Sequence, residues 1–134
     1  MGVLILGDEE VRELLDMESC IAAMETVLAA LAREELLNPL RTIMFTPSKR
    51  GMGLMPSWRG GDDPIFALKE IVVCPTNSQV GLDPHQGAVL LHDGTNGKLR
   101  AILNASAVTE IRTAAVSAVA TKLLARETPR QVAI

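Results

Sequence analysis

The hydrophobic pattern of this chain changes period twice, and the resulting order of elements limits the fold more than any other feature. Met17 to about Glu35 carries apolar residues at helical spacing, which predicts an amphipathic helix. Strand patterns follow between Arg41 and Leu103, and an alanine-rich helix is predicted from about Thr109 to Arg126. Helices before and after a run of strands favour an α+β fold. We expect N-terminal helices, a mainly antiparallel sheet with a hairpin, and a long final helix.

The strand predictions depend on apolar runs bounded by turn residues. Ile65–Cys74 is the strongest strand pattern in the chain. Ala88–Leu91 and Leu99–Leu103 flank Asp93-Gly94-Thr95-Asn96-Gly97, which is typical of a hairpin turn. Shorter strands are predicted at Val3–Leu6, Arg41–Phe45 and Gly53–Met55, the last of which ends at Pro56. The segment Pro75–Gly87 is predicted to be a long polar connection.

Residues that can accept backbone hydrogen bonds precede the predicted helices. Asp8 is expected to cap a short helix that runs through Leu15. Asp16 is expected to cap the longer helix, and Thr109 the last one. A further strand is predicted to begin at Gln131–Ile134.

Composition and charge argue against several kinds of partner. The chain has 13 Lys and Arg residues against 16 Asp and Glu residues, and its aromatic content is 2%. A nucleic-acid surface needs basic and stacking side chains, so none is expected. No apolar run is long enough to span a bilayer, so no membrane partner is expected. Cys20 and Cys74 fit no metal spacing and are expected to be free thiols, which favours a cytoplasmic protein.

No sequence motif indicates a metal or a bound nucleotide. His85 and His92 straddle a predicted loop and strand, so no metal site is expected from them. In its loop, His85 could contact a ligand or cap a turn. The sequence contains neither a G-x-G-x-x-G turn nor a P-loop, and no Ser-His-Asp order suggests a hydrolase.

Lys69 is the first candidate site residue because of the strand face on which it lies. Alternate residues of a strand share a face. Lys69 therefore shares its face with four apolar residues, Ile65, Ala67, Ile71 and Val73. An ammonium group in an apolar row costs free energy unless an anion compensates it. Two interpretations stay open: a lysine that faces a ligand, or an edge-strand or ion-paired lysine with a structural role.

Arg112 is the second candidate because a cation is disfavoured at the start of a helix. It lies in the first turn of the predicted last helix, where the helix dipole is positive. An anion between the guanidinium and free backbone N–H groups would explain this position, and Thr113 adds a hydroxyl there. The alternative is a structural pair with a nearby carboxylate.

Two more charged residues share strand faces with apolar neighbours. Arg41 lies on the face of Ile43 and Phe45, so it is either a third inward-pointing cation or a surface residue at the start of a strand. Glu70 lies on the face opposite to Lys69 and is expected to form a structural ion pair.

The stretch Asn104–Lys122, with Arg-Thr-Ala-Ala at residues 112–115, resembles the signature helix of the ornithine cyclodeaminase/mu-crystallin family. Leu54-Met55-Pro56, the lysine strand, His85-Gln86-Gly87 and the hairpin that ends in Asn96-Gly97 are similar to the family in order and spacing. The resemblance covers essentially the whole chain. It implies a substrate-binding and dimerisation domain at residues 1–128, with residues 129–134 beginning the first strand of a Rossmann domain.

The resemblance also implies roles for individual residues. Arg41, Lys69 and Arg112 match the positions that hold the substrate carboxylate, and Lys69 is also the catalytic candidate. Thr113 matches a position near the cofactor phosphates, and His85 is a second cofactor candidate. The implied cofactor is NAD(H) or NADP(H), bound only with the domain that follows, and the implied partners are a small amino or imino acid and a second copy of the chain.

Family reactions include cyclodeamination of ornithine, alanine dehydrogenation and reduction of cyclic ketimines. Ornithine cyclodeaminases carry a Glu before the Leu-Met-Pro sequence, where this chain has Gly53, which favours an imine reductase or an amino-acid dehydrogenase. The sequence ends where the glycine-rich turn of a cofactor domain is expected. We therefore also keep two other hypotheses: a non-catalytic dimerisation and ligand-binding module, and a structural domain whose Lys and Arg residues only pair with acidic side chains.

Overall fold

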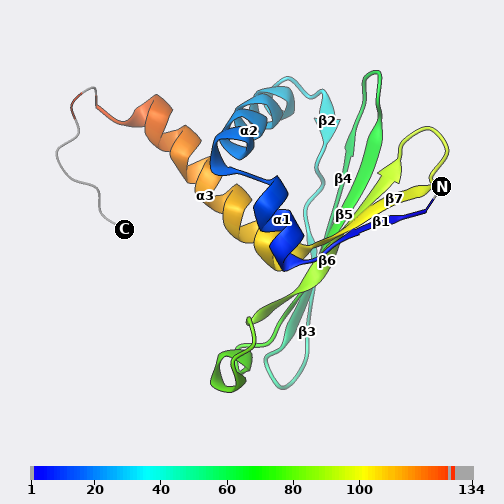
Figure 1. The fold of residues 1–134 in the computed structure, drawn as a ribbon, viewed down its shortest axis with the longest axis vertical. Coiled ribbons are helices and arrows are strands. Elements are labelled where there is room, and N and C mark those ends of the chain that lie inside the picture. Colours follow the sequence, from blue (N-terminus) through cyan, green and yellow to red (C-terminus); the bar gives the residue numbers. More distant parts are fainter. Residues whose placement is uncertain (1, 127, 129–134) are drawn as a thin grey trace.

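Seven strands form one mixed sheet in this computed structural model, which describes residues 2–126 and 128 (Figure 1). The strands are β1 (Leu4–Leu6), β2 (Leu36–Leu37), β3 (Thr42–Phe45), β4 (Gly51–Arg59), β5 (Ile65–Val73), β6 (His85–Asp93) and β7 (Leu99–Asn104). Their order is β1-β7-β6-β5-β4-β2, and β3 also pairs with β4. Strands β1 and β7 are parallel, and the other described neighbours are antiparallel.

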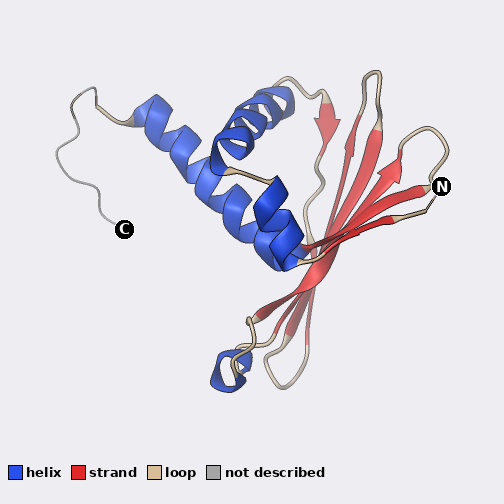
Figure 2. Ribbon diagram, viewed as in Figure 1, coloured by secondary structure: helices blue, strands red, loops and turns tan. Residues whose placement is uncertain are grey.

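The α-helices of the described residues lie on one face of this sheet, as Figure 2 shows. They are α1 (Asp8–Leu14), α2 (Met17–Ala32) and α3 (Ala105–Leu124). Helix α3 contacts α1, α2, β5, β6 and β7. Its buried residues are small or medium-sized, which allows close packing: Ala105, Ala107, Ala115 and Val119. The predicted α+β fold with a long alanine-rich helix is confirmed.

One of the two capping predictions in the N-terminal region is confirmed. Asp16 caps α2, because its Oδ1 accepts a hydrogen bond from the backbone N–H of Ser19 at 2.9 Å. Asp8 is the first residue of α1 and not its cap, so that prediction is wrong. The N-cap of α1 is Gly7, which has no side chain that could accept a hydrogen bond.

The predicted start of the last helix is also wrong. Helix α3 begins at Ala105, four residues before the predicted cap Thr109. The cap is Asn104, whose Oδ1 accepts a hydrogen bond from the backbone N–H of Ala107 at 2.9 Å. Asn104 is also the last residue of β7, so α3 follows the strand without a connecting segment.

Pro56 does not end β4, contrary to the prediction, because of its place in the sheet. On one side of β4, β3 pairs with residues 51–54 and β2 pairs with residues 58–59. Pro56 lies in the gap between these two segments, opposite Leu68 of β5. Proline has no backbone N–H to donate. On the side of β2 and β3, no strand pairs with residue 56, so no hydrogen bond of the sheet is lost there.

The β5–β6 connection is shorter than predicted. The connection was predicted over Pro75–Gly87, but strand β6 already begins at His85. The connection also contains a 3-10 helix, η1 (Asn77–Val80). The hairpin between β6 and β7 is confirmed, with Gly97 at a φ of 74°. The strand predicted at Gln131–Ile134, and with it the domain boundary at residues 129–134, lies outside the described residues.

The sheet face opposite to the helices is uncovered within the described part of the chain (Figure 2). Leu68, Leu90 and Ile102 lie side by side on it, one on each of β5, β6 and β7. Phe66 of the same face is 49% exposed. Glu70 also lies here, and no ion pair or hydrogen bond of its side chain is found among the described residues, so the predicted structural pair is not present.

Candidate functional site

Lys69 lies in the middle of the sheet rather than at its edge. Its strand β5 has β4 on one side and β6 on the other, so Lys69 is flanked by Met55 and Val89. Its side chain extends toward α3, where Nζ donates a hydrogen bond to Oγ1 of Thr109 at 3.2 Å. The predicted apolar setting is confirmed, and an edge-strand lysine is ruled out. Strand pairing therefore holds this ammonium group under the helix.

The pKa of Lys69 lies below its ordinary value. Partial burial is the largest cause, because removal of water disfavours the charged form. The positive charges of Arg112 and, less strongly, Arg41 lower the pKa further. Like charges close to a half-buried amine raise the free energy of its protonated form, and a bound anion would lower it.

Arg112 reaches this place from α3, although not from the first turn as predicted. Helix α3 begins seven residues earlier, at Ala105, and the free N–H groups of its start are therefore not beside Arg112. Residues one turn apart share a helix face, which puts Val108, Thr109 and Arg112 toward the sheet. An anion at this site is therefore held by side chains rather than by the end of the helix dipole.

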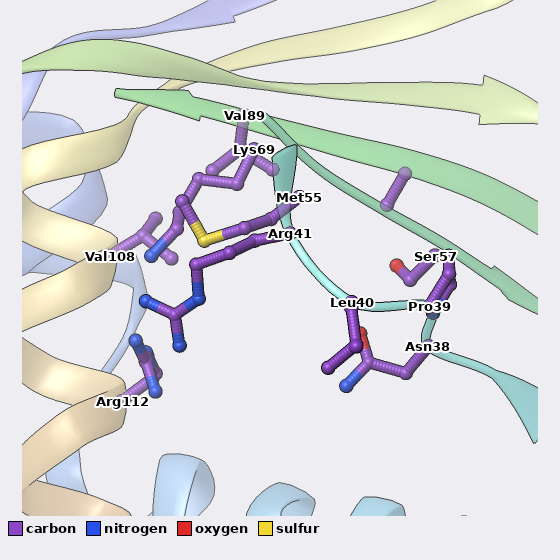
Figure 3. A pocket seen from close by; sticks show the side chains of 11 residues that line it. Asn38, Pro39, Leu40, Arg41, Met55, Ser57, Lys69, Val89, Val108 and Arg112 are labelled. Atoms are coloured by element: carbon purple, nitrogen blue, oxygen red, sulfur yellow. The ribbon is translucent and has the colours of Figure 1, made fainter. Parts of the chain in front are cut away.

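Arg41 completes the group of cations. It lies in the segment 38–41, which connects β2 to β3 and forms one wall of a pocket of about 470 Å³. Arg41, Lys69 and Arg112 all line this pocket, and Figure 3 shows the three nitrogen-bearing ends turned toward the same space. The rest of the lining is uncharged: Asn38, Pro39, Leu40, Met55, Ser57, Ala67, Val89 and Val108.

In the described residues, no acidic side chain forms an ion pair with any of these three cations. The hypothesis that the chain is a structural domain requires such pairs, and it places Lys69 and Arg112 on different surfaces. Both expectations disagree with the structure. An ammonium and two guanidinium groups in one pocket can hold a carboxylate through several charge-assisted hydrogen bonds.

Several residues in or beside this pocket were not predicted as site residues. Met55 and Val89 are beside Lys69 because antiparallel pairing places them there, and this register cannot be read from one strand alone. Thr109 was expected to cap a helix and instead positions Lys69. Asn38 was expected only to end a helix, yet it lines the pocket.

The two cofactor candidates lie outside this pocket lining. Thr113 follows Arg112 on α3 but is exposed and is not a lining residue. His85 pairs with Val73 at the far end of β5, four residues along the strand from the position opposite Lys69. That distance is about 13 Å at the usual rise of a strand. The structure therefore brings together the three candidates for carboxylate binding, and it places the two cofactor candidates away from them.

The starts of α1, α2 and α3 do not suit the pyrophosphate of a dinucleotide. This group usually lies at a helix start that follows a glycine-rich turn. The first turn of α1 is acidic, and the carboxylate of Asp16 occupies the start of α2. At the start of α3, the Asn104 side chain accepts a hydrogen bond from the Ala107 N–H, and the Ser106 hydroxyl donates one to the carboxylate of Asp83 at 2.5 Å. A phosphate is thus disfavoured at all three helix starts.

Metal and membrane features are not found among residues 2–126 and 128. No group of three or more His, Cys, Asp or Glu side chains is placed to hold a metal ion. Cys20 and Cys74 are both free, the first buried and the second half-buried. No described helix combines the length and hydrophobicity that crossing a bilayer requires.

Comparison with known proteins gives consistent matches over this region. The ketimine reductase mu-crystallin of Mus musculus is 36% identical over 124 residues, which cover 89% of this chain and 39% of the relative. A Thermococcus litoralis Delta(1)-pyrroline-2-carboxylate reductase, solved with NADH and L-proline, has a TM-score of 0.87 and 31% identity over 93% of this chain. An archaeal alanine dehydrogenase dimer with bound NAD has a TM-score of 0.87 and 28% identity over 94% of this chain.

The chain spans about two fifths of the length of these relatives: 39% of the reductase chain and 38% of the dehydrogenase chain. Residues 3–134 match the ornithine cyclodeaminase/mu-crystallin family, which is nearly the whole sequence. The chain therefore belongs to the ornithine cyclodeaminase/mu-crystallin family.

Proposed function

We propose that this chain forms the carboxylate-binding part of an NAD(P)-dependent enzyme that acts on a small amino or imino acid. The observation that carries the proposal is the group of three cations, Arg41, Lys69 and Arg112, in one pocket without an acidic partner in the described residues. An imine or ketimine reductase, or an amino-acid dehydrogenase, fits better than an ornithine cyclodeaminase. The pocket lining contains no carboxylate that could bind a second amino group.

In this proposal each residue of the site has a distinct task. Arg112 and Arg41 hold the substrate carboxylate by charge-assisted hydrogen bonds. Lys69 is the catalytic candidate, because its ammonium touches the same anion and is oriented by Thr109. Fixed orientation of the carboxylate sets the position of the neighbouring α-carbon. In this proposal the cofactor, NAD(H) or NADP(H), supplies the hydride chemistry, and no described residue of this chain is assigned to hold it.

Binding of small carboxylates to the 134-residue chain tests this proposal directly. We expect acetate to bind to the wild-type chain, as measured by calorimetry or NMR titration. Lys69→Ala and Arg112→Ala should each weaken binding by about tenfold or more, because a charge-assisted hydrogen bond contributes about 1.5–3 kcal/mol. Lys98→Ala, which removes an exposed lysine outside the pocket, serves as the matched control. Equal acetate affinity in all four proteins would reject the carboxylate site.

A non-catalytic dimerisation and ligand-binding module is the second candidate. The uncovered sheet face favours a homodimer, since Leu68, Leu90 and Ile102 form an apolar row that water would otherwise contact. The related alanine dehydrogenase was solved as a dimer. Calorimetry with NADPH on this chain tests the module, because micromolar binding would count against it. A cytoplasmic location stays a prediction.

Sedimentation velocity tests the dimer. We expect the wild-type chain to sediment as a dimer and Leu68→Asp to sediment as a monomer, because the substitution places a carboxylate in the apolar row. Lys98→Asp, also a change to a carboxylate but in the β6–β7 turn, should stay dimeric. A Leu68→Asp chain that is folded by circular dichroism and still dimeric would show that this face is not the interface.

A further inference from the structure

A second, apolar hollow adjoins the cation pocket on the same face of the sheet. It has a volume of about 210 Å³, and it shares Arg41 and Met55 with the larger pocket as lining residues. Its floor and sides are formed by apolar side chains of β3 and β5: Ile43, Phe45, Ile71 and Val73. The face is continuous, because Ile71 and Val73 are the next residues of the same parity after Lys69.

The hollow exists because two residues of β4 have no side chain. Gly51 and Gly53 pair with Val73 and Ile71 and occupy the places where side chains would fill this space. A Cβ atom on Gly53 would lie 3.4 Å from Cε of Met55 and 3.8 Å from Cγ2 of Ile71, which are ordinary contact distances. A small side chain is therefore compatible with this position, and a larger one would extend into the hollow.

We propose that this hollow binds the apolar substituent of the acid whose carboxylate lies on Arg41, Lys69 and Arg112, and that Gly53 determines which substituents fit. The inference rests on the carboxylate site of the proposed function. Ile71 lies about 7 Å along β5 from Lys69, which is within reach of a ring a few bonds from the carboxylate. An apolar cavity of about 150 Å³ is large enough for benzene, so the volume of about 210 Å³ takes a six-membered ring.

The lining also disfavours a positively charged substituent. Among the described residues that line the hollow, the charged ones are Arg41 and Lys49, and both are cations. A positively charged group placed over Ile71 and Val73 would lose water and lie near like charges, which costs free energy. Met55 lines both the hollow and the cation pocket, and its unbranched side chain can adjust to ligands of different width.

Two carboxylates with different substituents test the inference on the 134-residue chain. Acetate reports on the cation pocket alone, and 3-phenylpropionate reports on both spaces. We expect 3-phenylpropionate to bind about tenfold more tightly than acetate, because its ring leaves water. Gly53→Leu should remove this difference and leave acetate affinity unchanged, and Gly53→Ala should retain most of it. Gly53→Val provides a second filling variant with a side chain well suited to a strand.

The outcomes separate this inference from the proposed function. If acetate binds, depends on Lys69, and 3-phenylpropionate binds no better, the carboxylate site stands and the substituent site is rejected. Selectivity that persists in both Gly53→Leu and Gly53→Val also rejects it, since the ring then lies elsewhere. If neither acid binds, both the carboxylate site and the substituent site are rejected.

Discussion

Lys69→Met should make the chain more stable at neutral pH, although it removes a residue of the proposed site. The reason is the position of the ammonium group, which is half-buried in the centre of the sheet and close to two other cations. Burial and the charges of Arg112 and Arg41 lower its pKa, which means that they raise the free energy of the protonated form in the folded chain. Methionine has a similar length, carries no charge and packs easily beside apolar neighbours.

The expected gain is modest. Replacing buried charged groups by apolar residues is neutral or stabilising by about 1–4 kcal/mol. The lower end applies here because Lys69 is only partly buried, so water screens its charge. This range is a net outcome that already includes the hydrogen bonds lost with the charged group, here the one from Lys69 to Thr109. We therefore expect a net gain of about 1 kcal/mol, or a Tm that is higher by about 4 °C in a chain of this size.

The gain should depend on pH in a defined direction. A lysine whose folded-state pKa is lowered destabilises the fold fully at pH values below that pKa. This penalty disappears as the pH rises through the unfolded-state pKa of about 10.4, because both states are then neutral. The stability of the wild-type chain should therefore rise toward that pH relative to Lys69→Met.

Thermal unfolding followed by circular dichroism at pH 7 and pH 10.5 provides the measurement. Lys98→Met is the control, because Lys98 is exposed and its hydrogen bonds in the turn, to Asn96 and from Asp93, are made by its backbone. A Lys69→Met chain that is less stable than wild type at pH 7, or a difference that does not change with pH, would refute the reasoning. Addition of acetate should raise the Tm of the wild type and not that of Lys69→Met.

Two further substitutions test the elements that position the site. Asn104→Ala should lower the free energy of unfolding by about 1 kcal/mol, because the N–H of Ala107 loses its acceptor, while Asn104→Ser should lower it less, as measured by urea unfolding. Gly87→Ala should cost about 3 kcal/mol or more, because its Cβ would overlap the backbone carbonyl of Glu70. Gly61→Ala, where the Cβ meets open space at a φ of 95°, should cost only about 1 kcal/mol, and an equal loss in both variants would contradict this account.

Local sequence patterns predicted a feature correctly where the residues that determine it lie close together in the sequence. Strand parity correctly placed Lys69 in an apolar row, because alternation is set by the backbone of one strand. Asp16 was correctly identified as a cap, because its acceptor and the donor of Ser19 are three residues apart. The hairpin of β6 and β7 is confirmed for the same reason, since its turn residues are adjacent in sequence.

Local patterns failed where a distant part of the chain decides the outcome. Pro56 ends a strand by local rules, but the gap between β2 and β3 makes it acceptable inside β4. Arg112 was identified as a site residue for an incorrect reason. The argument needed a helix start at Thr109, whereas the helix begins at Ala105 and Arg112 faces the pocket through its helical spacing from Val108.

The arrangement of the three cations links the fold to the proposed function. Arg41 comes from a connecting segment, Lys69 from a central strand and Arg112 from the last helix, so only the folded chain brings them together. The chain as a whole has a net charge of −3, and the starts of α1 and α2 carry acidic groups. A small anion is therefore disfavoured at these helix starts and attracted at this pocket. A ligand that binds only the folded state stabilises it by an amount that grows with its concentration relative to Kd. The charge repulsion between Lys69 and the two arginines should thus be largest in the ligand-free chain, and a bound carboxylate should offset it.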